Sequence, residues 1–142
     1  SVGEFCKREE EAGVHALERL QAFAKAVRKS RDGLVQQLVA LRADGKRIVG
    51  IGAPAKGNTL LNYCKISTHL IEFLTDAAPS KVGLFSPGAH IPVVPESKLL
   101  EEQPDYGLIM AWNMKDELIG KFADYGNRGG QFIIPVPSFS VV

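Results

Sequence analysis

Apolar residues recur every three or four positions along the first part of the chain. Residues 4–43 are otherwise rich in charge and in good helix formers, and their apolar positions are Leu17, Leu20, Phe23, Val27, Leu34, Leu38 and Leu41. This spacing predicts one amphipathic helix, or two helices broken near Asp32-Gly33. A coiled-coil seam is an alternative, although the positions beside the seam show no clear alternation of charge. Gly45 is expected to end the helical segment.

A different pattern begins after Gly45, where short apolar runs alternate with helix-like segments. The predicted strands are 47–52, 71–76, 91–94, 106–112 and 131–136, and the predicted helices are 55–64, 96–102 and 115–125. Such alternation indicates an α/β fold with a parallel sheet. We expect a small Rossmann-like sheet of about five strands in the order 3-2-1-4-5, with flanking helices. Pro92 indicates that the third strand lies at an edge, and no helix is evident between the second and third strands.

These patterns divide the chain into a long helical segment over residues 1–45 and a Rossmann-like α/β domain over residues 46–142. The chain has 142 residues and a formal net charge of +1, with no basic cluster that would indicate nucleic-acid binding. No apolar run is long enough for a bilayer span. Cys6 and Cys64 lie far apart, which favours a reducing, cytoplasmic setting. The missing initiator Met suggests a piece of a longer protein.

The densest cluster of glycines follows the first predicted strand, in the segment Gly50–Thr59. Gly50, Gly52 and Ala55 match the dinucleotide-binding pattern G-x-G-x-x-A, and Asp76 stands near the place of the acid that binds a ribose. A P-loop is disfavoured, because Asn58 occupies the position of its lysine. The third possibility is a tight turn that binds no ligand.

Polar side chains at the start of the predicted helix 55–64 favour a bound anion. A helix N-terminus attracts anions through its free N–H groups and its dipole. Lys56, Asn58 and Thr59 add a charge and hydrogen-bonding groups at the same end. The residues therefore predict a site for phosphate or pyrophosphate at the carboxyl edge of the sheet.

Three motifs carry a resemblance to a known family. GAPAKGNTLLNY (Gly52–Tyr63), PGAHIP (Pro87–Pro92) and PDYGLIMAWN (Pro104–Asn113) closely resemble the C-terminal domain of bacterial nucleotide-sugar C-methyltransferases that depend on S-adenosylmethionine (SAM). The resemblance covers residues 5–137. It implies an enzyme with an N-terminal zinc domain, a middle domain that binds SAM and supplies the catalytic base, and a C-terminal domain that helps to hold the nucleotide sugar.

This chain shows no cysteine cluster and only one glycine-rich loop, so we expect it to be the third domain alone. On that basis it carries no catalytic residue, no metal ligand and no cofactor of its own, and neither NAD nor SAM need bind at the glycine loop. Its expected partners are a nucleoside-diphosphate sugar and the zinc and SAM domains of the same enzyme. We expect no nucleic-acid or membrane partner.

The predicted substrate-binding residues are Gly52, Ala53, Lys56, Gly57, Asn58, Thr59, Asp76, His90 and Asn113. Each has a plainer alternative: Asn58, Thr59 and Asn113 can cap helices, Asp76 can end a strand, and His90 can be a solvated loop residue. Trp112 can be a core residue or a stacking platform. Two other functions stay open, namely an NAD(P)-binding domain of an oxidoreductase and a structural or assembly module whose loop stays empty.

Overall fold

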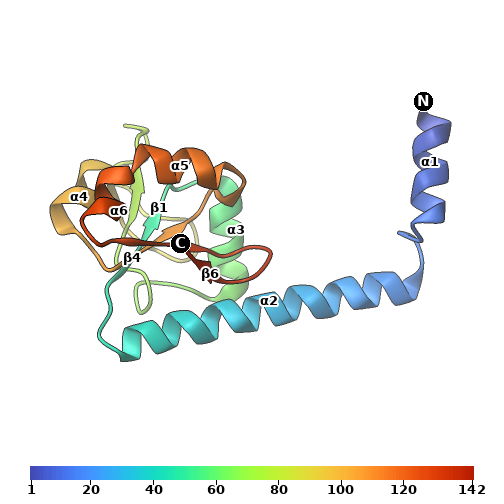
Figure 1. The fold of residues 1–142 in the computed structure, drawn as a ribbon, viewed down its shortest axis with the longest axis horizontal. Helices are drawn as coiled ribbons and strands as arrows, with labels where there is room; N and C mark the ends of the chain where they lie inside the picture. Colours follow the sequence, from blue (N-terminus) through green and yellow to red (C-terminus); the bar gives the residue numbers. More distant parts are fainter.

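The computed structural model describes residues 1–142 and contains a six-stranded sheet between two layers of helices (Figure 1). The strands are β1 (Ile48–Ile51), β2 (Leu74–Asp76), β3 (Val93–Pro95), β4 (Tyr106–Ile109), β5 (Gln131–Ile134) and β6 (Ser140–Val141). Their order is β3-β2-β1-β4-β5-β6, and all neighbours are parallel except β5 and β6. The predicted α/β class, the order of the first five strands and the edge position of β3 are confirmed.

The sheet differs from the prediction in its last strand and in several bounds. The antiparallel β6 was not predicted, because two residues are too few to show a pattern. β4 ends at Ile109 rather than at residue 112, since the chain turns into the short 3-10 helix η1 (Trp112–Met114). The connection from β2 to β3 contains turns and no helix, as expected.

The helices are α1 (Val2–Glu11), α2 (Leu17–Ala43), α3 (Ala55–Cys64), α4 (Ser97–Glu102), α5 (Lys115–Lys121) and α6 (Ala123–Asn127). The alternative of a break near Asp32-Gly33 is wrong, because α2 runs through both residues. The interruption falls instead at residues 12–16, where Gly13 has a φ of +64°. The predicted helix 115–125 is divided at Phe122, whose backbone leaves the helical region while its side chain is buried.

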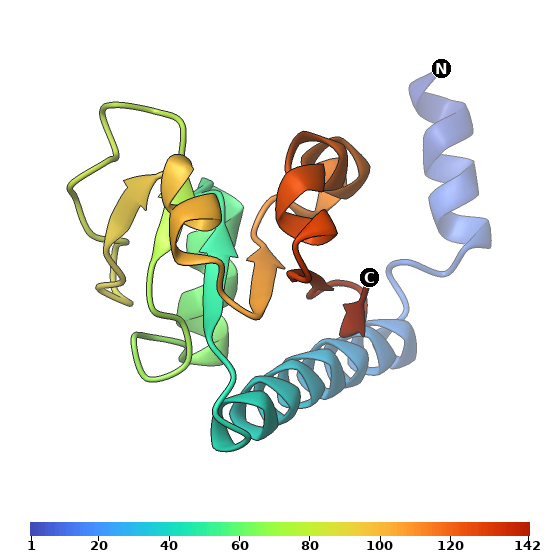
Figure 2. The same ribbon diagram turned by 60° about the vertical axis from the view of Figure 1, so that its left-hand side comes forward.

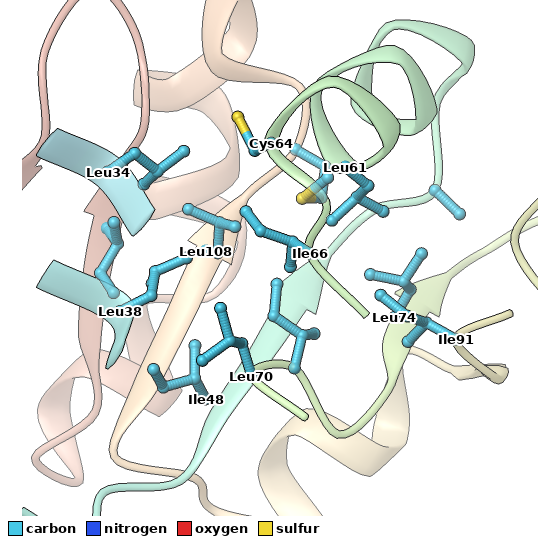
Figure 3. Packing of buried hydrophobic residues seen from close by; sticks show 14 of the residues in the cluster. Leu34, Leu38, Ile48, Leu61, Cys64, Ile66, Leu70, Leu74, Ile91 and Leu108 are labelled. Carbon is cyan, nitrogen blue, oxygen red and sulfur yellow. The ribbon is translucent and has the colours of Figure 1, made fainter. Parts of the chain in front are cut away.

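Alternate residues of the strands enter two separate apolar cores. Ile48 and Leu108 pack with Leu34 and Leu38 of α2 and with α3 on one face of the sheet (Figure 3). Val49 and Ile109 face α4, α5 and α6 on the other face. The cost of Gly33 inside α2, about 1 kcal/mol relative to alanine, is outweighed by burying Leu34 and Leu38 next to it.

The first helices project from this body as an arm. Only the second half of α2 lies against the sheet, whereas its first half and the whole of α1 extend away from it (Figures 1 and 2). α1 contains no buried residue, and the apolar side chains of Leu17, Leu20 and Phe23 are 68%, 52% and 68% exposed. The amphipathic stripe of α2 is therefore used by the core in its second half and is exposed at Leu17, Leu20 and Phe23 in its first half.

A cluster of charges joins the end of α2 to the amino ends of the strands. The Glu72 carboxylate accepts hydrogen bonds from Arg47, with its Nη2 at 2.8 Å, and from Arg42, with its Nη1 at 3.1 Å. Burial by itself would raise the pKa of Glu72, but the two guanidinium groups outweigh burial and hold that pKa below its ordinary value. None of the helices combines the length and apolar character needed to cross a membrane.

Candidate functional site

The glycine loop between β1 and α3 leaves a helix N-terminus open. Gly52 has a φ of +88°, which turns the chain away from the sheet. Pro54 occupies the N-cap position of α3 and provides no side-chain cap. The first hydrogen bond inside the helix runs from Asn58 N–H to the Pro54 carbonyl, at 3.2 Å. The N–H groups of residues 55–57 precede that bond and therefore have no partner inside the helix, and an anion site is built from such free N–H groups.

Asp76, at the end of β2, holds this loop in place. Its carboxylate accepts hydrogen bonds from the N–H groups of Ala53 and Ala78, both at 2.9 Å, and from Lys81 Nζ at 3.1 Å. Burial would raise the pKa of Asp76, but these donors outweigh burial and lower that pKa. The carboxylate is thus engaged by the protein itself, and contact with a ligand hydroxyl stays a prediction.

Lys56 and Thr59 line one side of α3, where they border a hollow of about 390 Å³ together with Tyr63 and Trp112. The ammonium of Lys56 lies 5.1 Å from the centre of the Trp112 ring, within range of a cation–π interaction. No carboxylate forms a salt bridge with Lys56, whereas Lys81 on the neighbouring loop is paired with Asp76. Lys56 is therefore the cation at this helix end that an anionic ligand can use.

Asn58 lies on the opposite side of α3, since two helical positions are separated by about 200° around the axis. It lines a second hollow, of about 480 Å³, between α3 and the loop that joins β2 to β3. The other lining residues are Ala53, Ala55, Lys81, Leu84, Phe85, Ser86, Pro87 and Val93. The predicted anion-binding residues therefore do not converge on one point, and the helix end stands between two hollows.

Residues 1–137 match the family described as the C-methyltransferase C-terminal domain. The chain belongs to this family. It is also similar to C-methyltransferase NovU from Streptomyces niveus, with 32% identity over all 142 residues. The match covers 34% of that protein, in its C-terminal part, so the chain spans about a third of the length of this relative.

Several predicted residues of this C-methyltransferase domain lie away from the two hollows. Gly57 is buried, and a Cβ there would come within 3.0 Å of the Met110 side chain, so its lack of a side chain serves the packing of α3 on β4. His90 is exposed, with a φ of +53°, and Asn113 is exposed in η1. Neither of these two residues lines either hollow.

The structure adds three residues that the sequence analysis did not select, namely Lys81, Leu84 and Phe85. Lys81 Nζ donates to the Ala53 carbonyl at 3.1 Å as well as to Asp76, so it braces the loop from the outside. Leu84 and Phe85 form one wall of the second hollow. A signal for this pair was present, since two large apolar residues stand between Gly83 and Pro87-Gly88 in a loop rich in turn residues.

The side chains of this domain do not fit a metal centre. No group of three or more His, Cys, Asp or Glu residues lies close enough together to hold a metal ion. Structural zinc sites in proteins need four such ligands as a rule. The zinc that the family resemblance implies would therefore need ligands from another part of a longer enzyme.

Proposed function

We propose that this chain is the nucleotide-sugar-binding domain of a SAM-dependent sugar C-methyltransferase. The diphosphate of the substrate binds at the amino-terminal end of α3. The observation that carries the proposal is the uncapped start of α3 beside Lys56, a cation without a carboxylate partner. Membership of the C-methyltransferase family supports the substrate class.

The proposal assigns the chemistry to other parts of the enzyme. Zinc and SAM are held by domains outside this chain, and the catalytic base belongs to the SAM domain. This chain contributes position and charge: the free N–H groups of the first turn and Lys56 hold the diphosphate, while Asp76 and Lys81 keep the loop in shape. Fixing the diphosphate orients the sugar for the methyl donor, and such positioning is itself a large part of catalysis.

The exposed arm supports the same assignment. Leu17, Leu20 and Phe23 continue the apolar stripe of α2 beyond the body of the domain. Large apolar side chains gathered on one surface usually mark a contact with another protein surface. The similar protein is about three times as long as this chain. We assign the arm to contact with the zinc and SAM domains of the longer enzyme.

The test is an NMR amide titration of this chain with thymidine diphosphate, SAM and NAD in parallel samples. The expected result is a shift of the amide signals of residues 52–59 with thymidine diphosphate and no shift with SAM or NAD. Shifts with NAD alone would replace the proposal with a dehydrogenase-like domain. A spectrum unchanged by all three compounds would contradict the proposal that this chain holds the diphosphate.

A further inference from the structure

An apolar groove of about 330 Å³ lies where α2, α3 and the β5–β6 loop meet. Its main apolar lining residues are Phe23, Val27, Leu34, Leu60, Tyr63 and Pro137. Phe23 also belongs to the exposed stripe of the arm, together with Leu17 and Leu20. The stripe and the groove therefore form one apolar surface along α2, which we call the α2 groove.

The walls of the α2 groove are held in place by polar contacts within this chain. The Ser30 hydroxyl donates a hydrogen bond to the Pro137 carbonyl at 2.8 Å, which ties the β5–β6 loop to α2. The guanidinium carbon of Arg31 lies 5.5 Å from the centre of the Tyr63 ring. Arg31 is fixed in turn by a salt bridge with Asp32, with its Nη2 at 2.7 Å. A groove that is already formed loses little conformational entropy when a partner binds.

The dimensions of the α2 groove fit a second α-helix. Leu17, Leu20, Phe23 and Val27 follow one another at three- and four-residue steps, so they lie on one side of α2. From Leu17 to Arg31 the helix rises about 21 Å, which matches a partner helix of about four turns. A small molecule in the groove would leave Leu17 and Leu20 exposed, whereas a helix laid along α2 covers them as well.

The charges along the α2 groove favour an acidic partner. By helical spacing, Arg19 and Arg28 lie about 80° and 100° around the axis from Val27, one on each side. Neither of these two cations forms a salt bridge, and the Asp32 carboxylate on the same helix is already engaged by Arg31. Carboxylates on both flanks of a partner helix would therefore meet cations that have no partner in this chain.

The same charges disfavour the arm of a second copy as the occupant. Residues 17–31 carry five cations and one carboxylate. Two such segments laid side by side would repel each other, because like charges at an interface oppose association. Charge complementarity therefore points to a helix of the opposite charge.

We propose that the α2 groove binds an amphipathic helix with acidic flanks that belongs to another domain of the longer enzyme. The apolar stripe of that helix covers Phe23 and Val27, and its carboxylates face Arg19 and Arg28. This inference rests on the proposed function, because it takes the partner to be part of the same C-methyltransferase. The groove adjoins the hollow that Lys56 borders, and the two share Val27 as a lining residue. The docked helix thus fixes the other domain beside the proposed diphosphate position.

The test is an NMR titration of this chain with three designed helical peptides. The first peptide has a leucine stripe and glutamate flanks, the second has the same stripe and lysine flanks, and the third has glutamate flanks and a serine stripe. We expect only the first to shift the amide signals of residues 20–31 and 60–64. Added salt should weaken its binding, because salt screens exposed charges. A weak affinity suffices for the proposal, since linkage within one enzyme raises the effective concentration of the helix.

Two pairs of variants separate the apolar contribution from the charged one. Phe23→Ser should weaken the first peptide about tenfold or more, whereas Val39→Ser, at a side chain 48% exposed on the second half of α2, should not. Arg28→Glu should weaken it about threefold to tenfold and should strengthen the peptide with lysine flanks. Lys29→Glu makes the same charge change on the opposite face of α2 and should have a smaller effect. All four positions are exposed, so the amide spectra should keep the native pattern.

Several outcomes would overturn this inference. If the peptide with lysine flanks binds as tightly as the first, the partner is not acidic. If no peptide binds and the chain sediments as a concentration-dependent dimer, a second copy covers the α2 groove. If no peptide binds and the chain is a monomer, the α2 groove is no docking site. Binding to vesicles of anionic phospholipid that Phe23→Ser abolishes, without binding of any peptide, would assign the surface to a membrane.

The titration with thymidine diphosphate keeps this inference distinct from the function on which it rests. Phe23→Ser should leave the affinity for thymidine diphosphate unchanged, because Phe23 does not line either hollow at the start of α3. If thymidine diphosphate does not bind, the proposed function falls, and with it the assignment of the partner to the same enzyme. The peptide titration then still decides whether the α2 groove takes an acidic helix.

Discussion

The carboxylate of Asp76 lies 2.9 Å from the backbone nitrogen of Ala53, so the end of β2 holds the loop that follows β1. In a dinucleotide-binding domain the acid at this place serves a ribose hydroxyl. Here its oxygens already accept two backbone N–H groups and the ammonium of Lys81. The glycine pattern therefore resembles that of an NAD site. In this chain, however, the Asp76 carboxylate holds the loop between β1 and α3 in place.

Asp76→Ala is expected to destabilise the domain because it leaves the N–H groups of Ala53 and Ala78 without their partner. The loss in the free energy of unfolding should be about 1–3 kcal/mol, which is the usual cost of unpaired buried groups. Urea denaturation measures it. Asp44→Ala is the control, because Asp44 is exposed at the end of α2 and forms no salt bridge. Equal stability of the two variants would show that the Asp76 contacts contribute nothing.

The Glu72 cluster predicts a dependence of stability on pH. The pKa of Glu72 is lower in the folded chain, so its contribution is present above the unfolded value of about 4.3 and is lost as pH falls through the folded value. Glu72→Gln should cost about 1 kcal/mol or less near neutral pH, since Arg47 is 39% exposed and solvent screens the pair. The difference from the native chain should shrink below about pH 4. Denaturation curves at pH 7, 5 and 3.5 test this, and a difference that is constant with pH would argue against it.

Lys56→Ala should weaken the binding of thymidine diphosphate by about tenfold or more, because a hydrogen bond to a charged group contributes roughly 1.5–3 kcal/mol. The readout is the dissociation constant from the NMR titration. Lys25→Ala, on the exposed arm, removes the same charge far from the site and should leave the affinity unchanged. Equal weakening in both variants would mean that only the net charge of the chain matters. Equal affinity in the native chain and Lys56→Ala would remove Lys56 from the site.

Two glycines of the β2–β3 loop allow backbone strain to be separated from steric overlap. Gly83 and Gly88 have φ values of +87° and +76°, so alanine is strained at both, by about 1–2 kcal/mol. A Cβ at Gly83 would meet open space, whereas one at Gly88 would overlap the Oδ1 of Asn62. Gly88→Ala should therefore lower the melting temperature more than Gly83→Ala. It should also release the hydrogen bond from Asn62 to the Pro87 carbonyl, and a smaller effect at Gly88 would contradict this account of the loop.

The two halves of α2 should respond differently to the loss of a leucine. Leu38 is fully buried against the sheet, and Leu38→Ala should cost about 2–5 kcal/mol of unfolding free energy. Leu20 is 52% exposed on the arm, and Leu20→Ala should change the stability of this chain by less than about 0.5 kcal/mol. Chemical denaturation of both variants checks the pair. A large effect of Leu20→Ala would mean that the arm packs on this chain or on a second copy.

Much of the fold was determined by local patterns in the sequence. Apolar residues recur with different periods in strands and in helices, so their pattern after Gly45 predicted where strands and helices lie. The preference for right-handed crossovers between parallel strands then predicted the order of five strands. The glycine loop was placed correctly between β1 and α3 because its turn residues act within a few positions. The long match around Gly52–Tyr63 predicted the family, which the comparison confirms.

The remaining features depend on contacts between distant segments. Asp76 and Ala53 are 23 positions apart, and no periodic pattern along the chain shows that the carboxylate turns back onto the loop. The sequence grouped Lys56 and Asn58 as one set, whereas the packing of α3 on the sheet turns them toward different hollows. Phe85 borders a hollow only because the fold brings the β2–β3 loop beside α3. Local preferences determine which elements form, but packing decides which side chains meet, because burial and hydrogen bonding are settled between elements far apart in the chain.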